Sequence, residues 1–597
     1  MLSYRKLAMR VLGRPLNTGG GIDSPRPASQ RAAAFILTAA MLTTLTAPAF
    51  AKTWDIADGD ITVKAGDTGN DVTQKGETTY GDTDTIITNQ NKDIASSNTV
   101  TIETNDKNDK VEVTLKDVNI NVGSDSGSAL TSNGDVTLTL KGDNSLTGGN
   151  GGSGISSSGS LTITGGEKDS LTAQGGSGRS GIFSSGGVTI SGGTVNATGG
   201  SSGSDSGDGI HSGSLTMKGG TVNAKGGSGA DGGSGIRTFS SGGVTISGGS
   251  TVNATGGDAS DKDASAGGSG ISGKGSLTVS GGTVTANGGN GSKSESSDRS
   301  NGGRGIDSGS LTVSGGTVTA TGGDGCSGSY SDGGIGISSS SGGVTIYGGT
   351  VTATGGKSGS GDYSNGGNGI SSSGSLSISG GTVTATAGSS SGSGIHSRSD
   401  IDLSGSLELT AKAGSPNGKA LSQNGIELDP NTFKEKLDPG ANIITKDADG
   451  KVIDQVSIPR PVEPEGPVIP EESSSSSDSG SSTPSADGGS ATPSAPASPL
   501  PGLTVTDKDG QRISYTSIRG NNVLSIRAGR FTASLRVSLA ALRQLRAEGI
   551  DTITFRTVLC STTLSVDELL AMGGEDAEVV LTHHIRSSTL TVGGKAV

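Results

Sequence analysis

A segment of about 30 residues recurs along the middle of the chain, and it constrains the fold more than any other feature. The clearest copy is residues 305–323, GIDSGSLTVSGGTVTATGG, and close copies run from about residue 154 to residue 388. Each copy holds a Gly-Ile pair, a Leu-Thr-Val-like segment, a Gly-Gly pair and a Thr-Val-x-Ala segment. The isoleucines of these pairs lie 25 to 35 residues apart; they are Ile155, Ile182, Ile210, Ile236, Ile271, Ile306, Ile337, Ile370, Ile395 and Ile426.

The residues within one copy alternate as they do in short strands. Alternate residues of a strand share a face. Ile306, the Leu311/Val313 pair and the Val318/Ala320 pair are therefore predicted to point inward, and Thr, Ser and Asn outward. Three such strands per coil predict an all-β parallel β-helix, in which each coil buries its apolar face against its neighbours. A right-handed coil is expected from the crossover rule.

The composition alone points in another direction. Glycine accounts for 108 of 597 residues and aromatic residues for 2%. So much glycine without a triplet repeat is typical of disordered chains. The regular return of Val, Ile and Leu favours a repeat fold that buries small side chains instead.

Residues 1–51 are predicted to be a signal peptide with an extended basic region. Six basic residues precede an apolar run over 32–45, and Ala49-Phe50-Ala51 fits a small-x-small cleavage site, so we expect cleavage after Ala51. A retained anchor is the alternative. No other stretch reaches about 18 apolar residues, so the mature chain is predicted to have no membrane span and to be secreted or held at the cell surface.

The charge of the mature chain limits its partners. The whole chain carries −13, and removing the leader, which carries +5, leaves −18. This sign disfavours nucleic acid and anionic lipid and suits divalent cations. Cys326 and Cys560 lie in different regions and are predicted to be unpaired.

The domain boundaries follow changes in the pattern. Residues 52–128 are interpreted as an N-terminal cap with the first coils, with Trp54 packed at the end, and 129–400 as the repetitive β-helix. Residues 401–458 are interpreted as the last coils and a C-terminal cap with a hairpin around Asp449-Gly450. Residues 459–502 form a Pro/Ser-rich linker that is predicted to be disordered.

Residues 503–597 are predicted to form a small α+β domain of unknown role. Phe531, Ala533, Leu535 and Val537 alternate as in a strand, and residues 552–558 are another strand candidate. Ser538 is a predicted N-cap for a helix over 539–548, and Ser565 with Glu568 predicts a capping box.

One corner of each coil varies in length while the strands keep theirs. This corner lies between the third strand and the next Gly-Ile pair, as in 201–208, 258–269, 290–304, 323–334 and 357–368. Insertions at one corner of a stacked fold gather on one edge, which is often the binding face.

Acidic residues in these corners are candidate calcium ligands, because calcium takes six to eight oxygen ligands. The alternative is a solubilising loop edge. Asp258, Asp261 and Asp263 form the densest cluster. The candidates are Asp205, Asp208, Asp231, Asp258, Asp261, Asp263, Glu295, Asp298, Asp324, Asp332 and Asp362.

Other patterns suggest contact with glycans. Tyr330, Tyr347 and Tyr363 are the candidates for stacking on sugar rings. Repeated Thr-x-Thr-x-Thr segments, such as 317–321 and 350–354, form an outward lattice that could match a crystalline polysaccharide or ice. Plain β-propensity on a solvated face is the alternative interpretation.

Evidence for catalysis is limited to one pair. Asp208 and His211 lie together in GDGIHS, and His396 lies in a similar segment. A corner aspartate next to a strand-edge histidine, without catalysis, is the favoured interpretation. His583-His584 lacks partners at zinc spacing.

Residues 109–149, DKVEVTLKDVNINVGSDSGSALTSNGDVTLTLKGDNSLTGG, and the later GI…LTVSGGTVTA coils carry a family resemblance. Over about 111–388 the chain resembles the clostridial secreted carbohydrate-binding family of right-handed parallel β-helices. The resemblance implies binding of acidic pectic glycans and cellulose, and calcium bound through acidic loops.

Together these observations favour a secreted, non-catalytic polysaccharide-binding β-helix that binds its glycan with the help of calcium. A structural or adhesive surface rod is the alternative. A polysaccharide lyase or hydrolase is the least favoured hypothesis.

Overall fold

The computed structural model describes the chain from Lys52 onward in several stretches, and it divides into two compact units between Gly466 and Pro467. The signal peptide, its cleavage site and Cys560 lie outside the described residues, as do Asp261, Asp263, Glu295, Asp298 and Asp362. The described residues are 52–104, 110–239, 241–260, 265–292, 300–326, 330–361, 363–460, 502–507, 510–513, 515–520, 523–528, 532–557, 561–572, 577–584, 588–593 and 595–596.

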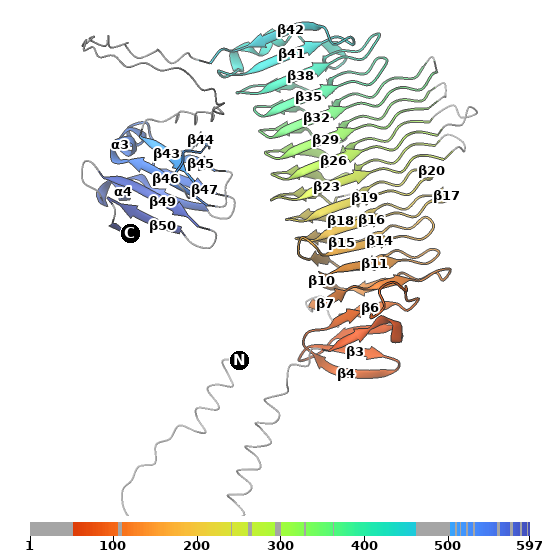
Figure 1. Ribbon diagram of the computed structural model, residues 1–597. Coiled ribbons are helices and arrows are strands. Elements are labelled where there is room, and N and C mark those ends of the chain that lie inside the picture. The colour runs from red at the N-terminus through yellow and green to blue at the C-terminus, as the bar shows by residue number, and fades with distance from the viewer. Residues whose placement is uncertain are drawn as a thin grey trace, which may run out of the picture. The chain divides into compact units, whose positions relative to one another are not determined.

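The first unit is a parallel β-helix with three strands per coil, as predicted (Figure 1). In the coil of residues 305–323 these are β27 (Ile306–Ser308), β28 (Ser310–Val313) and β29 (Thr317–Thr321). Each pairs in parallel with the equivalent strand of the coil before and the coil after. The coils therefore stack as three ladders, each built from one strand position.

The first ladder contains β6 (Val100–Glu103), β9 (Leu130–Asn133), β12 (Ile155–Ser157), the start of β15 (Ile182–Ile190) and of β18 (Ile210–Met217), β21 (Ile236–Thr238), β24 (Ile271–Ser272), β27, β30 (Ile337–Ser339), β33 (Ile370–Ser372), β36 (Ile395–Ser397) and β39 (Leu421–Gln423). The second contains β5 (Ile86–Thr88), β7 (Lys110–Lys116), β10 (Asp135–Lys141), β13 (Leu161–Thr164), the ends of β15 and β18, β22 (Val244–Ile246), β25 (Ser276–Val279), β28, β31 (Val344–Ile346), β34 (Leu376–Ile378) and β37 (Ile401–Leu403). The third contains β8 (Asn119–Asn121), β11 (Asp143–Thr147), β14 (Ser170–Gln174), β16 (Thr194–Thr198), β19 (Thr221–Lys225), β23 (Thr251–Thr255), β26 (Thr283–Asn287), β29, β32 (Thr350–Thr354), β35 (Thr382–Thr386), β38 (Glu408–Lys412), β41 (Asn442–Lys446) and β42 (Val452–Ser457).

The core consists of columns of like residues in register. Ile306 pairs with Ile337, Val318 with Val351 and Ala320 with Ala353, and all are fully buried. Identical side chains stacked in this way pack closely, and each coil is stabilised by its two neighbours. The predicted inward residues are confirmed.

The prediction that serine points outward is wrong at one position in most coils. Ser308 lies two residues after Ile306, so strand alternation puts both on the inner face, and Ser308 is buried. The equivalent Ser339 donates its hydroxyl to the carbonyl of Gly309 at 2.8 Å. Other members of this column also donate to a glycine carbonyl where the chain bends from the first ladder to the second, namely Ser157, Ser184, Ser372 and Ser397. The hydroxyls of Ser212 and Ser308 have no such partner. The buried members are Ser157, Ser184, Ser212, Ser308, Ser339, Ser372 and Ser397.

The two ends of the stack depart from the repeat. At the N-terminal end, β1 (Thr53–Asp55) is followed by η1 (Ile56–Asp58), and β2 (Ile61–Ala65), β3 (Asn70–Gln74) and β4 (Glu77–Asp82) form an antiparallel meander. Trp54 is buried there, as predicted, and its indole N–H donates to Asp82 Oδ2 at 2.9 Å. A hydrogen-bonded tryptophan thus closes the core against water.

The C-terminal end confirms one prediction and corrects another. β41 and β42 form an antiparallel hairpin around Gly450, whose φ is +86°, as predicted. Ile426 does not continue the inward isoleucine column: it is 68% exposed in the short β40 (Ile426–Glu427), and Leu421 pairs with Ile395 instead. The Gly-Ile pattern here marks a reversal of the chain, before η2 (Pro430–Lys436).

The second unit is a small α+β domain. β43 (Leu503–Thr506), β46 (Ala533–Ser538), β49 (Glu578–His583), β50 (Ser588–Val592) and β51 (Lys595–Ala596) form one sheet, and β44 (Thr516–Gly520), β45 (Val523–Arg527), β47 (Thr552–Arg556) and β48 (Ser561–Ser565) form another. α3 (Leu539–Ala547) begins after Ser538, whose hydroxyl accepts a hydrogen bond from Ala541 N as predicted, and α4 is Val566–Met572. Among the described residues, no helix is long and apolar enough to cross a membrane.

Candidate functional site

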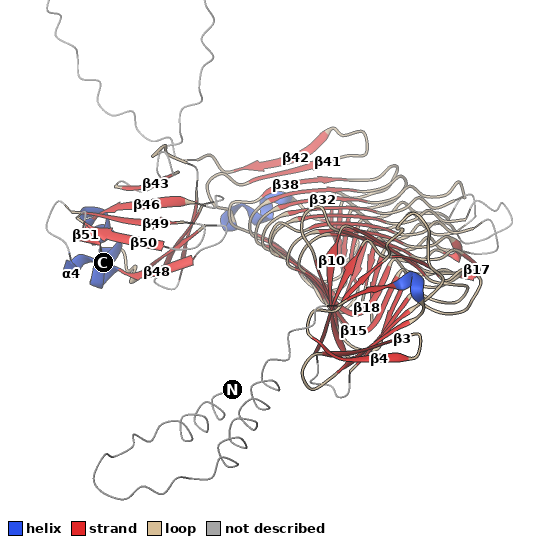
Figure 2. Cartoon of the chain, turned by 60° about the horizontal axis from the view of Figure 1, so that its bottom comes forward, coloured by secondary structure: helices blue, strands red, loops and turns tan. Residues whose placement is uncertain are grey.

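The variable corners form a hydrogen-bonded edge of their own. After the third ladder the chain runs outward through Gly-Gly and returns through a second Gly-Gly, and Figure 2 shows these loops gathered along one edge. Gly323 N donates to Gly303 O of the preceding coil's returning limb, and Gly334 N donates to Gly323 O, both at 2.8 Å. The same alternation runs from Gly127 to Gly388, and Arg179 is the one residue of the series that is not glycine. We call this array of outgoing and returning limbs the glycine edge.

Close approach of the backbones explains why these positions are glycine. A Cβ placed on Gly323 would lie 1.9 Å from Gly289 O, and one on Gly334 would lie 1.9 Å from Gly303 O. No residue with a side chain fits at these distances, although the backbone angles are not left-handed. Gly316 differs from these positions: its φ is +81°, so it serves the turn between β28 and β29.

Several predicted calcium ligands serve as hydrogen-bond acceptors for the edge. Asp258 Oδ1 accepts from Asn290 N at 2.7 Å, and Asn290 Oδ1 accepts from Asp324 N at 2.9 Å. Asp324 Oδ1 then accepts from Lys357 N at 2.8 Å. The carboxylates of this column are separated by a neutral asparagine, which keeps like charges about two coil spacings, ~10 Å, apart.

The remaining described carboxylates lie apart from that column. Asp332 Oδ1 accepts from Asn365 N at 2.7 Å. Asp205 and Asp231 are register partners in the short strands β17 (Ser202–Asp205) and β20 (Gly229–Asp231), and Asp231 also accepts from Ala266 N. Within the described residues no three Asp, Glu, His or Cys side chains form a group that could hold a metal ion. Calcium binding therefore stays a prediction, and five of its candidate ligands lie outside the described stretches.

Two of the three predicted tyrosines come together on the edge. The rings of Tyr330 and Tyr363 stack with centroids 5.2 Å apart and planes 12° apart, and the residues are 46% and 67% exposed. They belong to the corner loops of neighbouring coils. Tyr347 is also exposed, but it lies in the turn between β31 and β32, away from this pair in the coil.

Asp208 and His211 lie next to each other in the structure, and Arg237 joins them. Asp208 is 4% exposed; Oδ2 lies 3.2 Å from His211 Nδ1, Oδ1 lies 3.4 Å from Arg237 Nε, and Oδ1 accepts from Ser234 N at 2.7 Å. Burial raises the pKa of the Asp208 carboxyl, and the Arg237 charge partly offsets the rise. Burial also lowers the pKa of His211 against the attraction of Asp208. His211 is therefore neutral at neutral pH, with Nδ1 against the Asp208 carboxylate, and Arg237 supplies the balancing charge.

Two phenylalanines that the sequence did not single out flank this cluster. Phe183 packs edge-on against His211 with centroids 5.7 Å apart, and Phe239 lies over His211 at 4.5 Å. Phe183 and Phe239 also contact each other edge-on at 6.0 Å. They are 56 positions apart in the sequence, so only the register of three successive coils brings them together.

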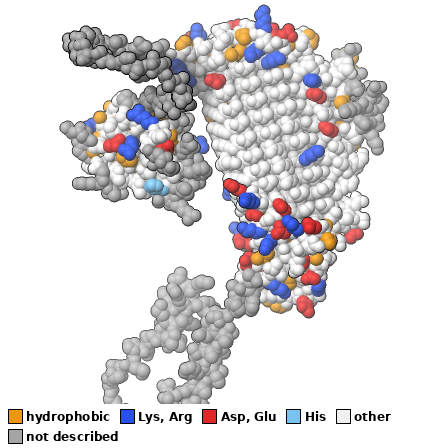
Figure 3. All heavy atoms as spheres, viewed as in Figure 1, with side chains coloured by type: hydrophobic (Ala, Val, Ile, Leu, Met, Phe, Trp, Pro, Cys, Tyr) orange, Lys and Arg blue, Asp and Glu red, His pale blue; other side chains and the backbone are white. Residues whose placement is uncertain are grey.

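The outward threonine lattice is regular. Thr317, Thr319 and Thr321 pair in register with Thr350, Thr352 and Thr354, and every outward residue from β26 to β35 is Thr or Asn. Figure 3 shows a broad uncharged surface over this ladder, with charged side chains gathered toward the two ends of the stack. In earlier coils the central column is Asn196, Asn223 and Asn253, whose side-chain amides are joined by 2.8 Å hydrogen bonds.

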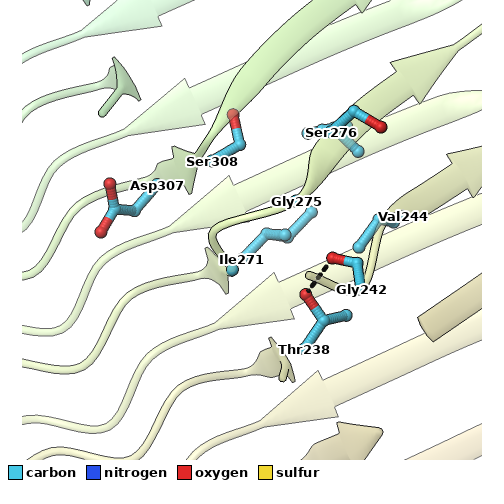
Figure 4. A pocket seen from close by; sticks show the side chains of 10 residues that line it. Thr238, Gly242, Val244, Ile271, Gly275, Ser276, Asp307 and Ser308 are labelled. Carbon is cyan, nitrogen blue, oxygen red and sulfur yellow. Dashed lines mark hydrogen bonds between the residues drawn. The ribbon is translucent and has the colours of Figure 1, made fainter. Parts of the chain in front are cut away.

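A small hollow lies where Gly273 interrupts the buried serine column, between Thr238 and Ser308 (Figure 4). Its volume of about 10 Å³ suffices for roughly one water molecule. Thr238 donates its hydroxyl to Gly242 O beside it. The hollow is therefore a packing defect of the ladder and too small for a sugar.

Comparison with known protein families agrees with this architecture. The family described as Beta helix repeat matches residues 188–214, 277–292, 311–336 and 376–397. These segments lie in the coils whose three ladders and glycine edge are described above. No curated protein and no solved structure matches the chain. The fold and the match place the chain among proteins built from parallel β-helix repeats, which include enzymes and non-enzymes.

Proposed function

We propose that the protein is a secreted, non-catalytic polysaccharide-binding β-helix, and that its binding surface is the glycine edge. One observation carries the proposal: the stacked, exposed rings of Tyr330 and Tyr363 at the outer rim of that edge. An aromatic ring offers an apolar face to the C–H face of a sugar and a hydroxyl to its polar rim. The two rings are held by neighbouring coils and stack on each other, so each leaves its outer face for a sugar.

The shape of the edge supports a polymeric ligand. Coils stack at ~4.8 Å, so the edge repeats a similar backbone surface many times along the stack. A chain lying along such an edge gains affinity from many weak contacts. The hydrogen bonds that engage Asp258, Asp324 and Asp332 with backbone N–H groups support a scaffold role for these carboxylates rather than acid–base catalysis.

Calcium is the proposed bridge to an acidic polysaccharide. The mature chain would carry −18, so an anionic polymer needs a cation between the two surfaces. Carboxylates on the edge, including the paired Asp205 and Asp231, supply the oxygen ligands that calcium prefers. Pectic polysaccharide is the proposed glycan, and cellulose is the neutral comparison.

The test is a pull-down of residues 52–597 on insoluble pectate and on cellulose, with and without a calcium chelator. The proposal expects retention on pectate that chelator abolishes, and retention about 3- to 10-fold weaker in Tyr330→Ala and Tyr363→Ala. Tyr80→Ala is the control, because Tyr80 is exposed in the N-terminal cap. Absence of binding to both glycans would contradict the proposal, and release of unsaturated or reducing sugar would show an enzyme.

Export is tested separately. Expression of the whole chain in a secreting host should deliver to the medium a protein whose N-terminal residue is Lys52. Intact mass spectrometry measures this, and a cell-bound product that retains the leader would contradict cleavage after Ala51.

A surface rod is the second candidate function. The in-register stack and the uncharged threonine ladder favour this function. A surface without charges does not attract charged molecules non-specifically. A rod without glycan affinity would remain on cells but would not bind pectate or cellulose in the same assay.

A further inference from the structure

Three successive coils break the serine pattern on the outer face of the first ladder. Serine is the commonest outward residue after the core isoleucine, but this residue is Phe183 in β15, His211 in β18 and Arg237 in β21. Phe239 follows Arg237 by two positions and shares its face. The chain has only seven phenylalanines, so two of them on one polar surface is an unusual concentration. The equivalent serines in other coils are Ser156, Ser272, Ser338 and Ser371.

The rings form an open apolar surface instead of a core. Phe183, His211 and Phe239 contact one another, with centroid separations of 4.5 to 6.0 Å. Phe239 remains 37% exposed on top of the cluster. A ring that is stacked from below and exposed above is positioned to receive a second flat apolar face.

A buried carboxylate orients the polar groups around these rings. Asp208 holds His211 through Nδ1, which leaves Nε2 as an acceptor. It also holds Arg237 through Nε, and Arg237 Nη2 donates to Ser234 Oγ at 3.4 Å. The guanidinium carries five N–H donors and its side chain is 46% exposed, so donors remain for a ligand.

The charges within the cluster cancel. Asp208 and Arg237 neutralise each other, and His211 is uncharged at neutral pH. An anionic sugar would have to compete with Asp208 for the guanidinium, whereas the hydroxyls of a neutral sugar can use the remaining donors without separating the pair. The cluster therefore favours a neutral ligand, unlike the acidic edge.

We propose that Phe183, His211, Arg237 and Phe239 form a second glycan subsite that binds a neutral pyranose ring. The apolar face of the sugar stacks on Phe239, and its hydroxyls bind Arg237 and His211 Nε2. The subsite lies on the outer face of the first ladder and needs neither calcium nor the glycine edge. It relies on the proposed function only for the class of ligand, a polysaccharide.

Affinity electrophoresis and calorimetry of residues 52–597 test the subsite. The probes are cellohexaose, xylohexaose and mannohexaose in the presence of chelator, with oligogalacturonate as the anionic comparison. Phe239→Ser and Arg237→Ser each introduce the residue that other coils carry at or near these positions. We expect at least one neutral hexasaccharide to bind, and each variant to weaken it about tenfold.

His396→Ser is the matched control, because His396 occupies the same outward position on the first ladder beside Ser371. Arg237→Lys is the second variant: it keeps the charge but loses the fork geometry, and it should weaken binding as well. A thermal melt of each variant shows whether the coils remain folded.

The outcomes separate this subsite from the proposed edge. Loss of neutral-sugar binding with pectate retention unchanged supports the subsite. Unchanged neutral-sugar binding in folded Phe239→Ser and Arg237→Ser, or no neutral-sugar binding by the unmodified protein, would overturn it even if pectate still binds. Loss of oligogalacturonate binding in Arg237→Ser would overturn the proposal that the subsite prefers a neutral sugar. If Tyr330→Ala and Tyr363→Ala leave pectate retention unchanged, only the proposed role of the glycine edge is contradicted.

Discussion

The β-helix and the C-terminal domain bury their apolar side chains in different ways. In the β-helix, Ile271, Ile306 and Ile337 stack on one another in one column. In the C-terminal domain, Leu542 of α3, Phe555 of β47 and Leu581 of β49 meet from unrelated elements. A coil contacts only its neighbours, so damage should spread a short distance, whereas a small globular core should fail as a unit. The predictions below test this difference.

The largest effect is expected where the β-helix depends on backbone contact alone. Gly323→Ala would put a methyl group 1.9 Å from Gly289 O, and we expect a loss of about 4 kcal/mol in unfolding free energy. Gly249→Ala is the control, because a Cβ there meets nothing within 4 Å. Urea titration followed by circular dichroism measures both. Equal effects at the two positions would show that the glycine edge adds no steric constraint.

Truncations of a buried side chain in the two cores should destabilise regions of different extent. Ile306→Ala and Leu542→Ala each remove a fully buried side chain and should each cost about 3 kcal/mol. Hydrogen exchange with mass spectrometry should show faster exchange within one or two coils of Ile306, but across the whole C-terminal domain for Leu542. Faster exchange throughout the β-helix in Ile306→Ala would contradict the picture of nearest-neighbour stability.

Acid should weaken the C-terminal domain through a buried histidine. His583 is fully buried against Phe555 and contacts Thr557 and Thr562 hydroxyls, and burial lowers its pKa below the usual 6.5. The unfolded chain therefore binds a proton that the folded domain excludes. The free energy of unfolding is therefore unaffected by this histidine above pH 6.5. It decreases as the pH falls below 6.5, by at most about 1.4 kcal/mol per pH unit for one proton.

Urea unfolding of the domain, followed by hydrogen exchange at pH 7.5, 6.5 and 5.5, measures this dependence. His583→Gln should be less stable at pH 7.5 but should lose the steep part of the acid dependence. His584→Gln, at the exposed neighbouring position, should behave as the unmodified chain. A pH profile that does not change in His583→Gln would exclude this histidine as the cause.

The smallest effect concerns the carboxylates of the glycine edge. Asp324→Asn keeps an oxygen that can accept from Lys357 N and should change stability by less than about 0.5 kcal/mol, whereas Asp324→Ala should cost about 1 kcal/mol. The same two variants test calcium, because a ligand role would make Asp324→Asn lose calcium-dependent pectate retention. Calorimetric titration with calcium separates the two roles.

The β-helix was predictable because its core repeats with the period of the coil. Alternation placed Ile306, Val318 and Ala320 inward without any knowledge of their neighbours, and stacking then followed from the repeat. Ser308 and Ile426 were misassigned for separate reasons. Strand alternation turns Ser308 inward because it lies two residues after Ile306, whatever its polarity, and a Gly-Ile pair can mark a reversal at the end of the stack.

The candidate sites were less predictable. Tyr330 and Tyr363 were candidates from the sequence, but their stacking depends on how two loops of different length fold over one another. Phe183, Arg237 and Phe239 carried no signal of their own, because each is an ordinary residue in its own coil. A search for outward aromatic residues at equivalent positions of successive coils would have found Phe183 and His211.

The sequence by itself determined the coil: three strands, inward columns of small apolar residues and one corner free to vary. It could do so because strand alternation and the repeat are local properties of the chain. Only the tertiary structure decided which residues of different coils meet, since contacts across the stack join positions about one coil apart and depend on every intervening loop. The glycine edge exists because the backbones of neighbouring loops approach closely. The Asp208–Arg237 cluster exists because the register of the strands brings residues of neighbouring coils together.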